Sequence, residues 1–269
     1  MAPYSPLFKI SPYKARMYTL CPAQYRWEYI ERRKDLRKPK PYLTLGEHVH
    51  NALKDFFRYE PEKRTREVLD VLFQAYWRTK RGPEGGFASM EQEERYKAKA
   101  LGMLDEFFRT QDLGAKPVLT EDLYEMPLGP GLALLGRIDR ADPEPDGSLR
   151  VLDYKTGRYS ERRSDKDDAQ LLAYALLVEH KLKRKVSKVA YLYLAACKVV
   201  ETVPSPEGLE LVRQDFIRTS RTILQAHRDG AFPALPNALC PWCFYLEICQ
   251  PALDAGKQPA PLEEETEEF

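Results

Sequence analysis

The chain has 269 residues, and its 42 basic and 41 acidic side chains leave a net charge of +1, so the whole-protein charge gives no sign of nucleic-acid binding. Hydrophobic residues make up 43% of the chain, yet no segment approaches the ~18–20 apolar residues of a membrane span. The first residues lack a signal-peptide pattern, so we expect a cytoplasmic protein without disulfides.

Helices are expected first along the chain. Ser11-Pro12 is typical of a helix N-cap followed by proline, and this helix should run to about residue 33 with a bend at Cys21-Pro22. Residues 44–47 form a capping box, which predicts a helix over residues 45–59. Two further helical patterns cover residues 62–79 and 89–112.

Strands follow from about residue 116, and turn signals separate them. The expected order is strands at 118–128, 131–142 and 149–156, a helix at 167–181, strands at 188–195 and 198–203, and a helix from 205 to 230. This order predicts an α/β fold in one domain, residues 1–253. Within it we expect a mainly helical part (1–115), a sheet core (116–230) and a Cys-rich segment (231–253), followed by a disordered acidic tail (254–269).

Three charged side chains are expected on one face of this sheet. Asp153 and Lys155 are two residues apart in a strand and therefore project to the same side, and Asp139 lies on the preceding strand, where it can sit beside Asp153. Two carboxylates with an ammonium group suit a hard divalent ion such as Mg²⁺ or Mn²⁺ and a bound water. The backbone carbonyl of Tyr154 is a further candidate ligand.

His50 is the candidate imidazole ligand. It shares a helix face with Gly46, Leu53 and Phe57, so it should point inward, whereas His48 lies about 200° away around the helix. Taken alone, an inward histidine is more often a hydrogen-bonded core residue than a ligand.

Four of the five cysteines have the spacing of a metal site. Cys240, Cys243 and Cys249 form a C-x₂-C-x₅-C pattern, and Cys21 lies more than two hundred residues earlier. Four thiolates accept either zinc or a [4Fe–4S] cluster. Cys197 is expected in a strand and in the core.

Taken together, these motifs resemble the RecB-like nucleases of the PD-(D/E)XK superfamily. The matching segments are the Gly46 to His50 helix, the Gly136 to Asp139 strand, Asp153-Tyr154-Lys155, and a Gln-x-x-x-Tyr helix at Gln170 and Tyr174. The resemblance implies a restriction-endonuclease-like fold with a mixed central sheet flanked by helices. It also implies that His50, Asp139 and Asp153 bind the metal, that Lys155 positions or activates water, and that Gln170 and Tyr174 line the site.

The cysteine arrangement is similar to that of the iron–sulfur branch of these nucleases, which includes AddB and the CRISPR-associated exonucleases. The resemblance implies that Cys21, Cys240, Cys243 and Cys249 hold a [4Fe–4S] cluster that closes the fold from its C-terminal end. It therefore favours the cluster over zinc.

The resemblance implies a metal-dependent DNA nuclease that hydrolyses phosphodiester bonds, and we expect an exonuclease acting on single-stranded ends. Basic side chains predicted to hold the DNA are Arg16, Arg26, Arg158 and Arg162. The alternative is a DNA-end-binding or assembly subunit of a helicase–nuclease or CRISPR adaptation complex, with little activity alone. DNA repair is one pathway that such a protein would serve. The sequence contains no G-x₄-G-K-[ST] phosphate loop, so an ATP-driven motor would have to be another chain.

Overall fold

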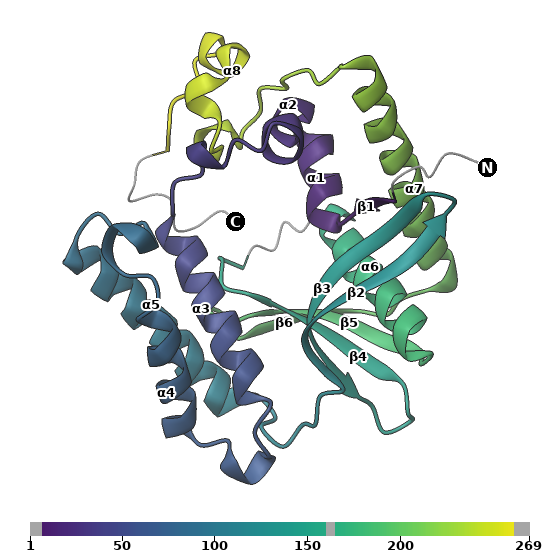
Figure 1. The fold of residues 1–269 in the computed structure, drawn as a ribbon. Helices are drawn as coiled ribbons and strands as arrows, with labels where there is room; N and C mark the ends of the chain where they lie inside the picture. The colour runs from purple at the N-terminus through teal and green to yellow at the C-terminus, as the bar shows by residue number, and fades with distance from the viewer. Residues whose placement is uncertain (1–6, 160–164, 261–269) are drawn as a thin grey trace. The chain divides into compact units, whose positions relative to one another are not determined.

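The computed structural model describes residues 7–159 and 165–260 (Figure 1). The strands are β1 (Phe8–Ile10), β2 (Leu119–Gly129), β3 (Leu132–Pro143), β4 (Leu149–Lys155), β5 (Val186–Tyr193) and β6 (Lys198–Thr202). The α-helices are α1 (Pro12–Leu20), α2 (Pro22–Tyr25), α3 (Pro41–Phe56), α4 (Arg66–Trp77), α5 (Met90–Thr110), α6 (Asp165–Leu182), α7 (Pro206–Asp229) and α8 (Gln250–Asp254). Among the described residues, no helix has both the length and the apolar character needed to cross a membrane.

The described residues divide into two compact units. The terminal unit holds residues 7–38, 125–136 and 206–260, and the central unit holds residues 39–124, 137–159 and 165–205. The single domain expected over residues 1–253 stays a prediction.

The central unit is built on a mixed sheet. The second half of β3 pairs antiparallel with β4, β4 pairs parallel with β5, and β5 pairs antiparallel with β6. Helix α6 makes the crossover between the parallel strands β4 and β5 and packs against both. Since helices lie on both faces of this sheet, the predicted α/β fold with a mixed central sheet flanked by helices is confirmed.

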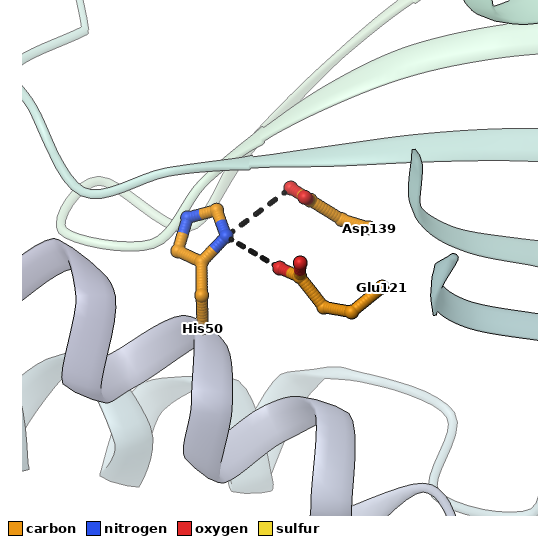
Figure 2. A group of neighbouring side chains, drawn as sticks. All are labelled: His50, Glu121 and Asp139. Carbon is orange, nitrogen blue, oxygen red and sulfur yellow. Dashed lines mark hydrogen bonds and ion pairs between the residues drawn. The ribbon is translucent and has the colours of Figure 1, made fainter. Parts of the chain in front are cut away.

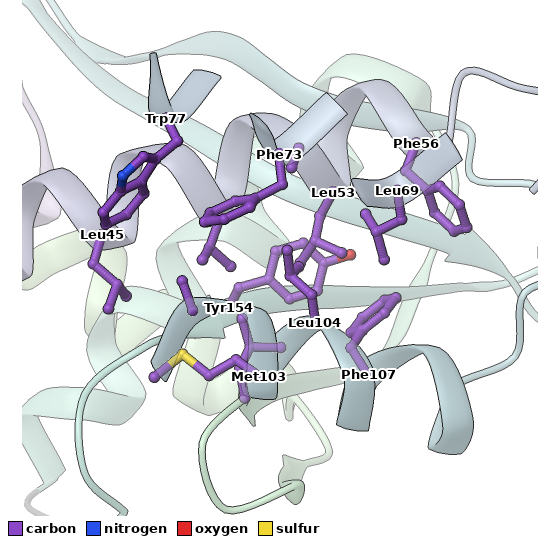
Figure 3. Close-up of a cluster of buried hydrophobic side chains, with 14 of the residues drawn as sticks. Leu45, Leu53, Phe56, Leu69, Phe73, Trp77, Met103, Leu104, Phe107 and Tyr154 are labelled. Atoms are coloured by element: carbon purple, nitrogen blue, oxygen red, sulfur yellow. The ribbon is translucent and has the colours of Figure 1, made fainter. Parts of the chain in front are cut away.

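Helices α3, α4 and α5 cover one face of the sheet through a shared apolar core (Figure 3). On α3 the buried residues recur at helical spacing, and they are Leu45, Val49, Ala52, Leu53 and Phe56. Tyr154 and Leu192 bring the sheet into the same core. Each fully buried Leu or Phe contributes roughly 1.5–3 kcal/mol relative to an exposed one.

The predicted start of α3 was wrong. The helix begins at Pro41 rather than at residue 45, its N-cap Lys40 makes no side-chain capping bond, and Thr44 is buried inside the first turns. Proline suits the first helical position because its φ is already fixed and no N–H is needed there. The helix therefore starts at the proline, although residues 44–47 carry a Ser/Thr-x-x-Glu capping signal.

The terminal unit contains the bend predicted at Cys21-Pro22. Ser11 caps α1 by accepting from the Lys14 N–H, and Cys21 takes an extended conformation between α1 and α2. A single π-helical turn, Arg26–Ile30, follows α2. Strand β1, which the sequence did not predict, pairs parallel with the start of β3.

The last described segment extends the terminal unit beyond α8. Part of the predicted acidic tail lies here, and the Ala260 N–H donates to the Pro241 carbonyl at 3.0 Å. Residues 261–269 lie outside the described part of the chain.

Cys197 was expected in a strand. It lies instead in the turn between β5 and β6, half-buried, with a φ of 47°. Four turn residues are needed there to reverse the chain, and the last of them adopts a left-handed conformation.

Candidate metal centre and its surroundings

Three potential ligands from three elements of the central unit converge on one point (Figure 2). His50 comes from α3, Glu121 from β2 and Asp139 from β3. The Nδ1 atom of His50 lies 3.2 Å from Glu121 Oε1 and 3.4 Å from Asp139 Oδ2, and the ligand atoms of the three residues all lie within 4.8 Å of one another. One imidazole and two carboxylates form a ligand set that suits Mn²⁺ and Mg²⁺.

Local backbone conformation brings the first two ligands together. Gly46 lies one turn before His50, and a Cβ added to it would sit 3.2 Å from Thr156 Oγ1, so a small residue lets α3 approach the end of β4. Glu121 has a φ of 54°, which is uncommon for a residue with a side chain. Strain of this kind persists where the surrounding structure requires it, and here it accompanies a carboxylate placed at the centre.

Burial and the charges within this group shift the pKa values of His50 and Asp139. Burial lowers the pKa of His50, but the carboxylates of Asp139 and Glu121 outweigh burial and raise this pKa to about 10. Burial and repulsion from Asp153 and Glu121 raise the pKa of Asp139 to about 6, although His50 acts to lower it. An ion that binds neutral imidazole must therefore displace a proton from His50, so its affinity should rise with pH.

Asp153 and Lys155 lie next to this group. As predicted from their spacing, both project to the side of β4 opposite Tyr154, and Lys155 Nζ is 2.6 Å from Asp153 Oδ2. Asp153 is within electrostatic reach of Asp139, and the Tyr154 N–H donates to Asp139 Oδ2 at 2.7 Å. The Tyr154 N–H therefore holds Asp139, and Lys155, the next residue of β4, holds Asp153.

Lys155 keeps its proton in this environment. Burial alone would lower its pKa, but the charge and hydrogen bond of Asp153 raise it above the usual lysine value. Its Nζ also lies 4.7 Å from the centroid of the Tyr191 ring, which adds a cation–π contact. The site therefore presents a cation whose position is set by two neighbours.

Gln170 and Tyr174 support Asp153 from α6. They are four residues apart and share a helix face, as the spacing predicts. The Gln170 Nε2 group donates to Asp153 Oδ1 at 3.1 Å and to the Tyr174 hydroxyl at 2.9 Å. Burial and the nearby carboxylates of Asp153 and Asp139 raise the pKa of Tyr174, so it stays a neutral phenol.

Glu121 is the residue whose importance the sequence did not reveal. It was not among the predicted ligands, and the second glutamate of the same strand, Glu125, forms an ion pair with Lys9 in the terminal unit. The Tyr154 N–H donates to Asp139 and its ring lies in the core, and the predicted role of its backbone carbonyl as a metal ligand stays a prediction. No local pattern in the sequence predicts that a glutamate will adopt the left-handed backbone conformation seen at Glu121.

The predicted DNA-binding arginines that the structure describes are shared between the two units. Arg16 is exposed on α1, and Arg26 is ion-paired with Glu31 at 2.8 Å and lies over the Trp27 ring, both within the terminal unit. Arg158 is exposed just after β4 in the central unit, and Arg162 lies outside the described residues.

Four cysteines form a second candidate site, in the terminal unit. Cys249 is buried, Cys21, Cys240 and Cys243 pack against the same small core, and all four thiols are free. Burial raises the pKa of Cys243 to about 11, and the other three cysteines add to this rise.

Each of these sulfurs receives a backbone hydrogen bond. The N–H of Leu235 donates to Cys21 Sγ at 3.5 Å and that of Asn237 to Cys240 Sγ at 3.2 Å. Backbone groups of Tyr245 and Ala252 do the same for Cys243 and Cys249 and act to lower their pKa. Donors directed at sulfur favour thiolate, the form that binds metals.

Comparison with known proteins decides the family. The model of the PD-(D/E)XK nuclease superfamily matches residues 9–250. The chain belongs to this superfamily. It is therefore a nuclease; members of this superfamily use divalent metal ions, and the family implies a DNA substrate. No curated protein matches the chain.

Two solved structures resemble this PD-(D/E)XK nuclease. The "Putative exonuclease" from Eubacterium rectale is 10% identical, covers 96% of this chain and 90% of its own, and gives a TM-score of 0.52. The crystal structure of SSO0001 is 15% identical over 91% of this chain and 86% of its own, with a TM-score of 0.43. At 10% identity, the likeness to the Eubacterium rectale protein shows a shared fold alone.

Glu121→Gln should lower the affinity of the nuclease for Mn²⁺ at least about tenfold, because it removes one charged oxygen ligand. Isothermal titration calorimetry on the purified protein measures this affinity. Glu125→Gln is the matched control, since it changes the same residue type on the same strand but outside the metal centre. Equal affinities for the two variants would remove Glu121 from the ligand set.

Proposed function

We propose that this protein is an exonuclease that hydrolyses phosphodiester bonds at single-stranded DNA ends. Phosphodiester hydrolysis is supported most directly by one observation. The Asp153–Lys155 pair lies next to the group formed by His50, Glu121 and Asp139. The Eubacterium rectale "Putative exonuclease" shares the fold, which favours attack at ends. The RecB-like branch is proposed on the motifs and cysteines of the sequence.

His50, Asp139 and Asp153 would hold the ion, and Glu121 would complete the ligand set. A bound divalent ion lowers the pKa of water and offsets charge on the phosphate oxygens. Lys155 supplies positive charge beside the reacting phosphate, where charge grows as the bond to water forms. Its contact with Asp153 sets where that charge lies.

Gln170 and Tyr174 act in this proposal through Asp153. The Gln170 amide donates to one carboxylate oxygen while Lys155 contacts the other, so the orientation of Asp153 is fixed from two elements. A fixed carboxylate loses little freedom when the ion binds, and this lowers the entropic cost of binding.

We propose further that Cys21, Cys240, Cys243 and Cys249 hold a [4Fe–4S] cluster with a structural role. The four sulfurs fit this group because each is supplied with a backbone donor, and such hydrogen bonds are a recognised feature of iron–sulfur ligation. The cluster would restrict the unfolded chain by closing a very long loop. The helicase or CRISPR adaptation partner stays a prediction.

Cleavage without ATP or a partner protein tests the nuclease proposal. Anaerobically purified protein is incubated with Mn²⁺ or Mg²⁺ and three DNAs: end-labelled single strands, blunt duplexes and circular single strands. We expect the linear single strand to be degraded fastest and the circle to resist, because an exonuclease needs an end. Loss of activity in chelator is expected as well.

Each alternative outcome has a definite meaning. Cleavage of the circle would make the protein an endonuclease. Failure to cleave any of the three DNAs with either metal would favour a DNA-end-binding subunit that depends on a partner.

A further inference from the structure

A row of aromatic and basic side chains continues from Lys155 across the central sheet. The strand register pairs Lys155 of β4 with Tyr193 of β5, and Tyr193 with Lys198 of β6. Laterally paired residues project to the same face of a sheet, so these three side chains stand side by side. The preceding row pairs Asp153 with Tyr191 in the same way.

The tyrosines of this row form a continuous group with Tyr159, which follows β4. The ring centroids of Tyr191 and Tyr193 are 6.1 Å apart, and those of Tyr193 and Tyr159 are 5.2 Å apart, both edge to face. Lysines flank the group, because Lys155 Nζ lies 4.7 Å from the Tyr191 ring and Lys198 Nζ lies 5.9 Å from the Tyr159 ring. We call Tyr159, Tyr191, Tyr193 and Lys198 the tyrosine strip.

The strip lies partly at the surface. Tyr159 and Tyr193 are half-buried, whereas Lys198 and the neighbouring Arg158 are exposed. Core packing alone does not account for two exposed cations beside half-buried rings. A mixture of aromatic faces and cations is the surface on which single-stranded nucleic acids bind, because bases stack on rings and phosphates attract the cations.

Resting on the proposed function, we propose that the tyrosine strip binds an unpaired nucleotide next to the phosphate that is cut. The base stacks on Tyr193 and Tyr159, and Lys198 contacts the phosphate that follows it. A base inside a duplex is already stacked and paired, so a duplex would have to be melted before one of its bases could use this subsite. A single strand can use it directly. The strip therefore selects single-stranded substrate directly beside Lys155.

An abasic scan combined with substitution of Tyr193 tests this subsite. Binding of fluorescent single strands, each with one abasic position, is measured in Ca²⁺ for wild type, Tyr193→Leu and Tyr193→Phe. We expect one abasic position near the end to weaken wild-type binding about tenfold. Tyr193→Leu should weaken binding of the intact strand by a similar factor and should lose nothing more on that abasic strand, whereas Tyr193→Phe should bind like wild type.

Additive losses on the abasic strand, or equal losses for Leu and Phe, would overturn the proposal, because neither result involves base stacking. Lys198→Ala gives an independent measurement at an exposed residue, and the slope of log affinity against log salt should fall by about 0.7. An unchanged slope would also count against the strip. Wild-type cleavage in Mn²⁺ is recorded separately, so absence of nuclease activity is distinguished from absence of the stacking subsite.

Discussion

Lys155→Met should lower the rate of DNA cleavage about 100- to 1,000-fold, the usual effect of removing one charged group that stabilises a transition state. Methionine keeps the length and apolar stem of the side chain and removes only its positive charge. Because Asp153 loses its cationic neighbour at 2.6 Å, the affinity for Mn²⁺ should not weaken. Single-turnover cleavage together with calorimetric Mn²⁺ titration separates the two effects.

Lys188→Met is the control for this substitution. Lys188 lies on β5 of the same sheet, and its nearest charged partner is Glu144 at 3.6 Å, away from the metal centre. We expect this variant to cleave at the wild-type rate. If Lys155→Met retained more than about a tenth of wild-type activity, Lys155 would have no direct part in the chemistry.

Cys243→Ser should abolish the proposed iron–sulfur cluster and destabilise the terminal unit strongly. A hydroxyl is a poor replacement for thiolate, and loss of one ligand removes the free energy that metal binding adds to folding. Iron and sulfide content, visible absorption and the thermal unfolding temperature, all measured on anaerobically purified protein, report the change. We expect colourless protein with a clearly lowered unfolding temperature.

The fifth cysteine provides the matched control. Cys197 lies in the β5–β6 turn of the central unit, so Cys197→Ser should keep full iron content and near wild-type stability. Stoichiometric zinc in place of iron in the wild-type protein would replace the cluster with a tetrahedral zinc site. Loss of iron in both variants would show that the four-cysteine assignment is wrong.

Local periodicity predicted much of the fold. Alternating strands and turn signals located β2, β3 and β4 to within one residue at each end, because side-chain direction repeats every two residues in a strand. The start of α3 was misplaced because two helix-start signals, Pro41 and the capping box at residues 44–47, stand close together and compete. Strand β1 has only three residues and forms through pairing with a distant strand, which no local pattern records.

The candidate site likewise contains residues that local spacing predicted and one residue that it did not. Pairs two or four residues apart, Asp153 with Lys155 and Gln170 with Tyr174, were expected on shared faces, and the structure places them so. Glu121 was not singled out, because its approach to His50 depends on a left-handed backbone and on contact between residues 71 positions apart. Such contacts are properties of the folded chain rather than of any segment.

The order in which a ribosome makes this chain has a consequence for the terminal unit. Its early and late segments bind each other directly, since Asn237 donates to the Leu20 carbonyl and Tyr245 donates to Glu28, in each case across 217 positions. The helices α3 to α5 can pack while synthesis continues, but the surroundings of Cys21 stay incomplete until residues near 250 have emerged. A chain that stopped before residue 240 would lack three of the four thiols, so the proposed cluster could form only after the Cys-rich segment had been made.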